Sequence, residues 1–331
     1  MEAIFPTWAY GVVCLASALI SALSAPFWIR SAQRLGLIDH PGARKIHARP
    51  MPLVGGLIVA TGLLIPMLGA LALVKLALLD APLLELSSYG LNQRTLQLAG
   101  LFAGALAMLG LGIVDDRSAL SARPKLVAQF LIALLVTSTG TRVTLFIPNP
   151  LVSYLITILW FLTLINAFNF TDNMNGLCTG LAAISALTFA VHAALPSHYL
   201  VATIGFLVAG ALLGYLPFNY PNAKTFLGDS GSHLVGYLIA AIAVLPHFHH
   251  PEQPNKWGVI SPLLILGLVW IDFAWVILYR LWHRCPIYIG DTNHLSHQLV
   301  RRGFSPPAAV AALWLTHATL CLSSFLLTRS P

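Results

Sequence analysis

Residues 96–125 read LQLAGLFAGALAMLGLGIVDDRSALSARPK, an apolar run that ends in two adjacent carboxylates, Asp115 and Asp116. A run of about 20 apolar residues is enough to cross the hydrocarbon core of a bilayer. Two neighbouring carboxylates repel each other unless a cation or a shared proton lies between them. An ordinary helix end with solvated charges is the alternative, but acids are disfavoured at a helix C-terminus. At the edge of a membrane span, the pair therefore predicts a metal or proton site.

The composition of the whole chain also indicates a membrane protein. Of its 331 residues, 57% are hydrophobic and 9% are charged, and the mean hydropathy is +0.80. Soluble globular chains carry roughly 25% charged residues, so a single soluble domain is excluded. We expect an all-α, polytopic helical bundle that forms one integral-membrane domain over residues 1–331. The first span lacks the pattern of a cleavable signal and is expected to remain in the membrane.

Ten apolar runs predict about ten transmembrane helices. The runs lie near 8–29, 52–74, 96–114, 126–146, 150–165, 177–195, 199–217, 232–246, 258–282 and 306–328. Most of the 18 Lys and Arg residues follow the odd-numbered runs, so the positive-inside rule places those loops in the cytoplasm and both termini outside. The longest loop on the outer side, 75–95, is expected to hold a short interfacial helix.

Polar residues gather in five segments on the predicted cytoplasmic side. These segments lie near 30–51, 115–125, 166–176, 218–231 and 283–305. We therefore expect one cytoplasmic active site, assembled from all five at the membrane surface. The net charge of +7 is attributed to loops that face anionic lipid, and no nucleic-acid partner is expected. The four cysteines form no CxxC pair, so disulfides and thiolate metal sites are not expected.

Two of the five segments are rich in cations. The first places Lys45 and His47 ahead of Gly55 and Gly56, and cations beside a Gly-rich turn suit a phosphate or diphosphate. An anchor on lipid headgroups is the alternative for this segment. The second places Lys125 after the aspartate pair, where carboxylate oxygens suit Mg²⁺ that bridges to a substrate phosphate.

The third segment, INAFNFTDNMNGL, concentrates amides next to an apolar span. Its spacing of three places Asn166, Asn169 and Asp172 on one face if the segment is helical. Amides near hydrocarbon need partners, which a sugar phosphate or nucleotide would supply. A cluster of interhelical hydrogen bonds is the alternative.

The last two segments add an aspartate among small residues and a pair of histidines. Asp229 lies in GDSG before a predicted helix, which suits a metal or a phosphate, although a simple N-cap turn is the alternative. His294, His297 and Arg301 share one helical face in HLSHQLVR. Two histidines alone make a weak metal site, so phosphate binding is favoured for this group.

Four motifs in this order resemble one family. They are the Asp-Asp pair, N-x-x-N-x-x-D-x-x-x-G-L, F-x-G-D-x-G-S and H-x-x-H, all between residues 39 and 302. The chain resembles the polyprenyl-phosphate N-acetylhexosamine-1-phosphate transferases of the glycosyltransferase family 4 type, cousins of the phospho-N-acetylmuramoyl-pentapeptide transferase. The resemblance implies Mg²⁺-dependent transfer of a sugar-1-phosphate from a UDP-N-acetylhexosamine to undecaprenyl or another polyprenyl phosphate, with release of UMP. Mn²⁺ is an alternative metal.

The resemblance also implies roles for individual residues. Asp229, together with Asp116, is expected to bind the metal. Asp115, Asp116 and Asp172 are the expected catalytic residues, with Asp115 set to deprotonate or orient the lipid phosphate. The expected substrate-binding residues are Lys45, His47, Lys125, Asn166, Asn169, Asn175, His294, His297 and Arg301.

The chain departs from the family pattern at Asn175, where members commonly have a second aspartate, and at Ser296, where they commonly have a histidine. The first loop resembles the N-acetylglucosamine branch, so UDP-GlcNAc is the expected donor and UDP-MurNAc-pentapeptide the alternative. The expected location is the inner (plasma) membrane, where the product would initiate cell-envelope glycan synthesis, and family members often form homodimers. An inactive scaffold or a transporter of the same fold is the rival from another class, whereas the CDP-alcohol phosphotransferase motif is not matched.

Overall fold

The computed structural model describes residues 6–41, 49–79, 81–143, 149–245, 260–288 and 290–328. This part of the chain is almost entirely helical, as predicted. Its helices are α1 (Thr7–Ser31), α2 (Gly55–Lys75), α3 (Ala81–Gln93), α4 (Thr95–Ser118), α5 (Ala122–Ser138), α6 (Pro150–Thr171), α7 (Leu177–Ala194), α8 (Tyr199–Asn219), α9 (Gly228–Val244), α10 (Ser261–Ile265), α11 (Gly267–Trp282), α12 (Leu295–Arg301) and α13 (Pro306–Thr328). A short antiparallel pair, β1 (Ile38–Asp39) and β2 (Met51–Pro52), closes the first loop.

The lengths and apolar composition of the helices fit a membrane protein. Each of the ten apolar runs contains a helix. Within the described residues, seven helices are long and apolar enough to span a bilayer, namely α1, α2, α4, α6, α7, α8 and α13. The loop at 75–95 holds α3, as predicted.

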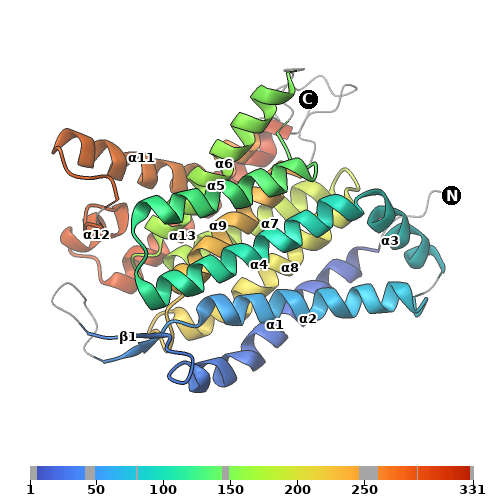
Figure 1. Cartoon of the computed structure of the whole chain (residues 1–331), viewed down its shortest axis with the longest axis horizontal. Helices are drawn as coiled ribbons and strands as arrows, with labels where there is room; N and C mark the ends of the chain where they lie inside the picture. Colours follow the sequence, from blue (N-terminus) through green and yellow to red (C-terminus); the bar gives the residue numbers. More distant parts are fainter. Residues whose placement is uncertain are drawn as a thin grey trace.

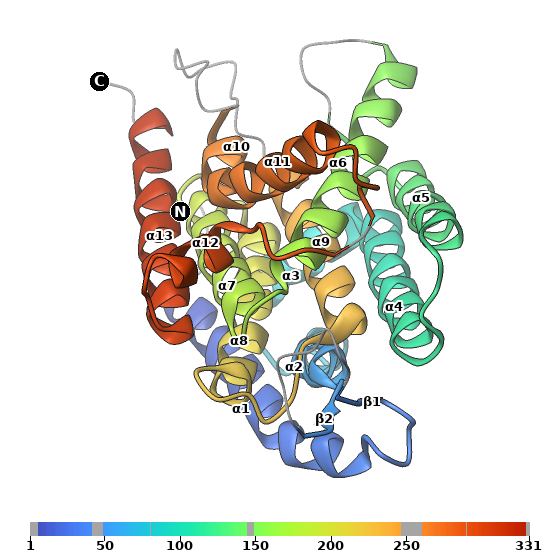
Figure 2. The ribbon, with the colours of Figure 1, turned by 90° about the vertical axis from the view of Figure 1, so that its left-hand side faces the viewer.

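The run at 258–282 differs from the single span that was predicted. Its described part is divided at Leu266, where φ is −95° and ψ is 9°, into the short α10 and the longer α11. The amide of Leu266 donates to the carbonyl of Pro262 at 3.1 Å, and the amide of Trp270 donates to the carbonyl of Leu266 at 3.0 Å, so backbone hydrogen bonds continue on both sides of the bend. Figure 2 shows α11 crossing α6, which it contacts.

Helix α9 forms the centre of the bundle. It contacts α2, α4, α6, α7 and α8, and almost every residue from Ser230 to Ala243 is buried. Small residues allow this close packing, because a Cβ on Gly112 of α4 would lie 2.3 Å from the Cα of Ser230. A Cβ on Gly236 would lie 2.7 Å from the Cα of Ile165 in α6. Close backbone approach through glycine is typical of helices packed within membranes.

The turns that carry the predicted site lie at one end of the molecule. In Figure 1 the β1 strand, the α4–α5 turn and α12 lie toward the left, whereas the start of α1 lies toward the right. This arrangement agrees with the expectation that the polar segments share one face. Lys45 and His47 fall outside the described residues.

Candidate active site

The Asp-Asp pair lies in the last turn of α4, against the beginning of α9. Asp116 accepts two backbone hydrogen bonds there, from the amide of Asp229 to Oδ1 at 2.8 Å and from the amide of Ser230 to Oδ2 at 3.0 Å. Unpaired amides at a helix start favour a carboxylate, which here comes from a different helix. Gly228 makes the turn possible, because its φ is +72° and a Cβ would lie 2.9 Å from Asp116 Oδ2. Asp116 therefore fixes the position of Asp229.

Asp115 points to a different set of partners. Its side chain is buried, and Oδ1 accepts the amide hydrogen of Leu120 at 2.8 Å. Its Oδ2 forms an ion pair with Lys125, the residue after Pro124 at the start of α5. The ammonium of Lys125 also lies 3.6 Å from Asp229 Oδ2. A single lysine thus stands between two carboxylates that come from α4 and α9.

The end of α6 supplies an amide and a third carboxylate to the same place. Asn169 donates to Asp229 Oδ1 at 2.5 Å and to Ser232 Oγ at 2.9 Å. Asp172 follows as the C-cap residue of α6. Burial raises the pKa of Asp172 to about 8, with further increases from the charges of Asp229 and Asp116, against a hydrogen bond from Gly228 that lowers it.

Asp115 and Asp229, the two carboxylates on either side of Lys125, form a carboxylate cluster that fits a divalent cation. One ligand atom from each of Asp115, Asp229 and His233 lies within 4.8 Å of the other two. Among the described residues, these three form the one group of this kind. Hard carboxylate oxygens are preferred ligands of divalent cations. The excess of acid around Lys125 gives such a cation a favourable charge environment.

The His294 side chain is held in place by a buried aspartate of α11. Its Nδ1 donates to Asp272 Oδ2 at 2.7 Å, while Asp272 Oδ1 accepts the amide hydrogen of Leu295 at 2.7 Å. Asp272 thereby caps α12 and orients the imidazole, so that Nε2 is the nitrogen left for another partner. His294 is the N-cap of α12 rather than a residue within it, a small difference from the predicted helical face.

The α11–α12 loop is pinned by Arg280, near the end of α11. This arginine is only 2% exposed. It donates to Asp291 Oδ2 at 2.7 Å and to the carbonyl of Ile287, and its guanidinium lies 4.8 Å from the centre of the Phe170 ring. Partial burial raises the pKa of Asp291, but hydrogen bonds from Arg280 and Asn293 outweigh it and keep the pKa below its ordinary value.

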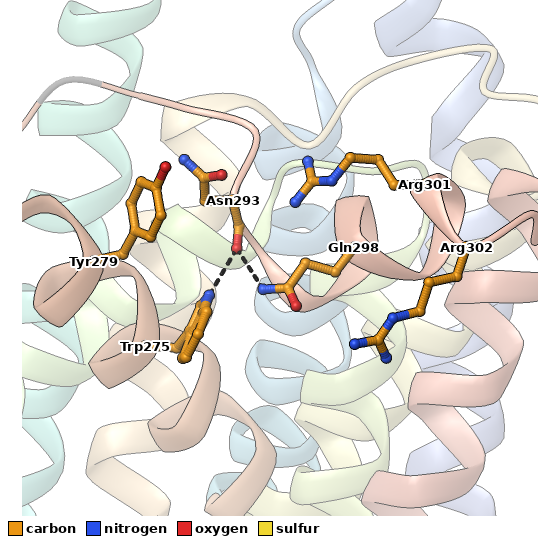
Figure 3. Close-up of a pocket in the computed structure, with 6 residues that line it drawn as sticks. All are labelled: Trp275, Tyr279, Asn293, Gln298, Arg301 and Arg302. Atoms are coloured by element: carbon orange, nitrogen blue, oxygen red, sulfur yellow. Dashed lines mark hydrogen bonds between the residues drawn. The ribbon is translucent and has the colours of Figure 1, made fainter. Parts of the chain in front are cut away.

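A cavity of about 300 Å³ opens beside α12, and Figure 3 shows its lining. Its aromatic side is formed by Trp275 and Tyr279 of α11, and its cationic side by Arg301 and Arg302. The carbonyl of Asn293 accepts from Trp275 Nε1 and from the Gln298 amide, both at 3.0 Å. An aromatic wall with two guanidinium groups suits a phosphate attached to an apolar or planar group.

His297 lies next to this region and is half-buried. Its ring centre is 6.3 Å from that of His294. Burial lowers the pKa of His297, and the charges of His294 and Arg301 lower it further, against Asp272 and Asp291, so the neutral imidazole is favoured. A neutral imidazole can donate to a phosphate oxygen through one nitrogen.

The segment that carries these carboxylates is similar in sequence to known proteins. Residues 98–247, which include Asp115, Asp116, Asp172 and Asp229, match the family model described as glycosyl transferase family 4. The chain is 31% identical over 312 residues to the decaprenyl-phosphate N-acetylglucosaminephosphotransferase of Mycobacterium tuberculosis, covering 86% of this chain and 74% of that protein. The chain belongs to glycosyl transferase family 4.

Other members of the family are similar over most of their length. The probable undecaprenyl-phosphate N-acetylglucosaminyl 1-phosphate transferase of Bacillus subtilis is 28% identical over 324 residues, which are 96% of this chain and 84% of that protein. The undecaprenyl-phosphate alpha-N-acetylglucosaminyl 1-phosphate transferase of Thermotoga maritima is 28% identical over 271 residues, which are 82% of this chain and 75% of that protein. The resemblance inferred from the motifs is therefore confirmed.

The two departures from the pattern of family 4 have structural partners. Asn175 is exposed and donates to the carbonyl of Pro221 at 3.3 Å, which joins the α6–α7 and α8–α9 loops. Ser296 is buried and donates to Asn173 Oδ1 at 2.6 Å, which joins α12 to the α6–α7 loop. Both residues hold loops of the site together.

Some residues of the predicted binding segments make hydrogen bonds within the protein. Asn166 donates to Gln129 of α5 at 2.7 Å and to the carbonyl of Leu162, which matches the interhelical alternative. The amides of Gly55 and Gly56 donate to the carbonyls of Phe226 and Leu227, so they are not free to bind a phosphate. A Cβ on Gly56 would lie 2.6 Å from the amide of Gly231, which shows that this glycine serves packing against α9.

Sequence reasoning missed three residues of the site: His233, Asp272 and Arg280. His233 follows Asp229 by four residues, a spacing that places both on one helical face and is visible in the sequence. Asp272 and Arg280 lie in an apolar run, where a charged residue is itself a sign of function. Their partners in α12 and its loop are distant in sequence, and no local pattern predicts those contacts.

Proposed function

We propose that this protein transfers N-acetylglucosamine-1-phosphate from UDP-N-acetylglucosamine to undecaprenyl phosphate or another polyprenyl phosphate. An oxygen of the lipid phosphate attacks the sugar-linked phosphorus of the donor, a new P–O bond forms, and the bond to the leaving UMP breaks. The observation that carries the proposal is the carboxylate cluster of Asp115 and Asp229 around Lys125, in a chain of family 4.

The carboxylate cluster would hold the metal, Mg²⁺ or alternatively Mn²⁺. Asp229 and Asp115 are the ligands that the geometry favours, because their oxygens converge. When bound, the cation offsets the negative charge of the donor diphosphate and of the leaving UMP. Asp116, whose two oxygens accept amides of α9, acts mainly as a positioning residue for Asp229.

Residues around the carboxylate cluster orient the two anionic substrates. Lys125 is the cation that contacts these carboxylates among the described residues, and its flexible ammonium can turn toward a phosphate when a metal takes its place. Asn169 keeps Asp229 in one orientation through its hydrogen bond at 2.5 Å. Asp172 lies at the end of α6, next to the turn of Gly228, where its carboxyl group can hydrogen-bond a phosphate oxygen.

The α11–α12 region supplies the anion-binding side of the site. His294, oriented by Asp272, and the neutral His297 are suited to donate to phosphate oxygens. Arg301 is the neighbouring cation, and one of its nitrogens already donates to the carbonyl of Thr292 at 2.6 Å. This bond fixes the guanidinium at the rim of the cavity in Figure 3.

We also propose the location of the reaction. The Lys and Arg distribution supports a cytoplasmic face for the site in the plasma membrane, because UDP-sugars are cytoplasmic donors and cations are enriched on this side. The lipid-linked product would then serve cell-envelope glycan synthesis. A homodimer remains a prediction from the family.

UMP release tests the proposal directly. Purified protein would receive undecaprenyl phosphate and a panel of UDP-sugars, including UDP-GlcNAc and UDP-MurNAc-pentapeptide, with Mg²⁺ or EDTA. We expect metal-dependent release with UDP-GlcNAc, lowered at least about 100-fold in Asp229→Asn because a ligand and its charge are lost.

The matched control is Glu85→Gln, which neutralises an exposed acid of α3 outside the carboxylate cluster. This variant is expected to release UMP at the wild-type rate. Folded protein that releases no UMP with any donor and either metal would contradict the proposed activity.

A further inference from the structure

Within the part of the chain that the structure describes, His233 is a buried histidine without a hydrogen-bond partner. Its side chain is 0% exposed, and neither Nδ1 nor Nε2 has a partner among the described residues. An imidazole buried in this way loses its bonds to water and gains none in return, which destabilises the fold. A ligand that accepts a hydrogen bond from the imidazole, or a metal that binds its unprotonated nitrogen, would offset this destabilisation.

The other deeply buried histidines differ from His233. His317 Nε2 lies 2.8 Å from Ser185 Oγ, His192 Nε2 lies 2.8 Å from Ser324 Oγ, and His294 is bonded to Asp272. Each is therefore a hydrogen-bonded histidine of the core. Among the described residues, no such hydrogen bond explains why His233 is buried.

The position of His233 beside two carboxylates offers a reason for its burial. It lies one turn after Asp229 on the same face of α9, and one of its ring nitrogens lies within 4.8 Å of carboxylate oxygens of Asp115 and Asp229. The side chain thus points into the carboxylate cluster from the interior of the bundle. Two carboxylate oxygens and one imidazole nitrogen then converge from α4 and α9.

The mixture of ligand atoms determines which metals are favoured. Mg²⁺ prefers oxygen ligands and retains several waters, whereas imidazole suits first-row transition metals such as Mn²⁺ better than it suits Mg²⁺. We propose that His233 is a nitrogen ligand of the metal bound by Asp115 and Asp229, and that it shifts the preference of this site from Mg²⁺ toward Mn²⁺. This inference deepens the proposed function, because it concerns the metal of the same site.

Lys125 would have two states at such a site. Its ammonium pairs with Asp115 Oδ2 and lies 3.6 Å from Asp229 Oδ2, between the same two carboxylates that a metal would bind. Metal binding and this ion pair are therefore alternatives. Displacement of the lysine leaves its charge next to the metal, where an anionic substrate would neutralise it.

Pulsed electron paramagnetic resonance of bound Mn²⁺ tests the proposal, because it detects coupling to an imidazole ¹⁴N. All samples would carry His247→Ser, His249→Ser and His250→Ser, so that three histidines close in sequence offer no competing nitrogen ligands. We expect nitrogen coupling in this background and in His317→Gln, a matched buried histidine, and no coupling in His233→Leu. The ratio of the Mg²⁺ and Mn²⁺ dissociation constants is expected to fall by about tenfold or more in His233→Leu.

Two further measurements make the outcomes distinct. Thermal unfolding in EDTA should show His233→Leu to be as stable as the parent or more stable, because an unpartnered imidazole is replaced by a buried apolar group; His233→Gln serves as a second variant. Mn²⁺ bound without nitrogen coupling, coupling that persists in His233→Leu, or no Mn²⁺ binding would each overturn the proposal. UMP release by the same samples distinguishes the proposed activity from the proposed role of His233. Turnover without nitrogen coupling would reject only the role of His233 as a ligand. Nitrogen coupling without turnover would reject only the transferase activity.

Discussion

Asp115 and Asp116 are neighbours in the sequence, yet their carboxylates have different partners. Asp116 accepts two amides at the start of α9, whereas Asp115 pairs with Lys125 and lies near Asp229. Successive residues of a helix point about 100° apart, so two adjacent side chains seldom share one target. The sequence predicted that this pair belongs to the site, but the division of roles depends on α9, more than 100 residues later in the chain.

At the residue scale, Asp172 predicts a dependence of stability on pH. Its pKa is raised from 3.8 to about 8 in the folded protein, so folding takes up a proton between these values and the metal-free protein loses stability as the pH rises through this window. Asp172→Asn removes this dependence. We expect the melting temperature of the variant in EDTA to exceed that of the wild type by a margin that grows from pH 5 to pH 8 and then levels off, while UMP release is lost.

The control for this prediction is Glu85→Gln, whose melting temperature should follow that of the wild type across the same pH range. A constant difference between Asp172→Asn and the wild type at every pH would show that the carboxyl group of Asp172 titrates normally in the folded state.

At the scale of elements, the site depends on how closely α4 and α9 approach. Asp116 can reach the amides of α9 because Gly112, one turn earlier in α4, has no side chain between the two helices. The helices themselves were predictable from apolar runs, and the GDSG motif predicted the start of α9. The bend at Leu266 has no proline or glycine at the residue itself to mark it, and the position of α12 depends on contacts with distant segments, so neither was predictable from a local pattern.

Gly112→Ala tests this approach. The new Cβ would lie 2.3 Å from the Cα of Ser230, so the helices must separate, at an expected cost of about 1–3 kcal/mol in unfolding free energy. The shift would also weaken the hydrogen bonds from α9 to Asp116, and UMP release should fall at least about tenfold. Thermal unfolding and UMP release would be measured on the same samples.

Gly110→Ala provides the matched control in the same helix, because a Cβ at Gly110 meets no atom within 4 Å. This variant should retain wild-type activity and stability, or gain slightly in stability through higher helix propensity. Equal effects of the two substitutions would contradict the role assigned to close α4–α9 packing.

At the scale of the whole molecule, the proposed orientation places the α11–α12 loop in the cytoplasm. Cys285 is exposed in this loop, whereas Cys178 and Cys321 are buried. In a Cys14→Ser background, a membrane-impermeant maleimide should therefore label the protein in inverted membrane vesicles and not in intact spheroplasts. Labelling in spheroplasts alone would reverse the orientation and place the site on the outer face.

The proposed reaction moves a phosphorylated sugar, and not the sugar alone, to a lipid phosphate. UDP-GlcNAc labelled with ³²P at the β-phosphate, which is attached to the sugar, reveals which bond breaks. With undecaprenyl phosphate and metal, we expect the label to move into the lipid fraction while unlabelled UMP is released. Label recovered in UDP would mean that only the sugar moves, and label that stays in intact UDP-GlcNAc would mean that the protein does not catalyse the transfer; either result would overturn the proposed reaction.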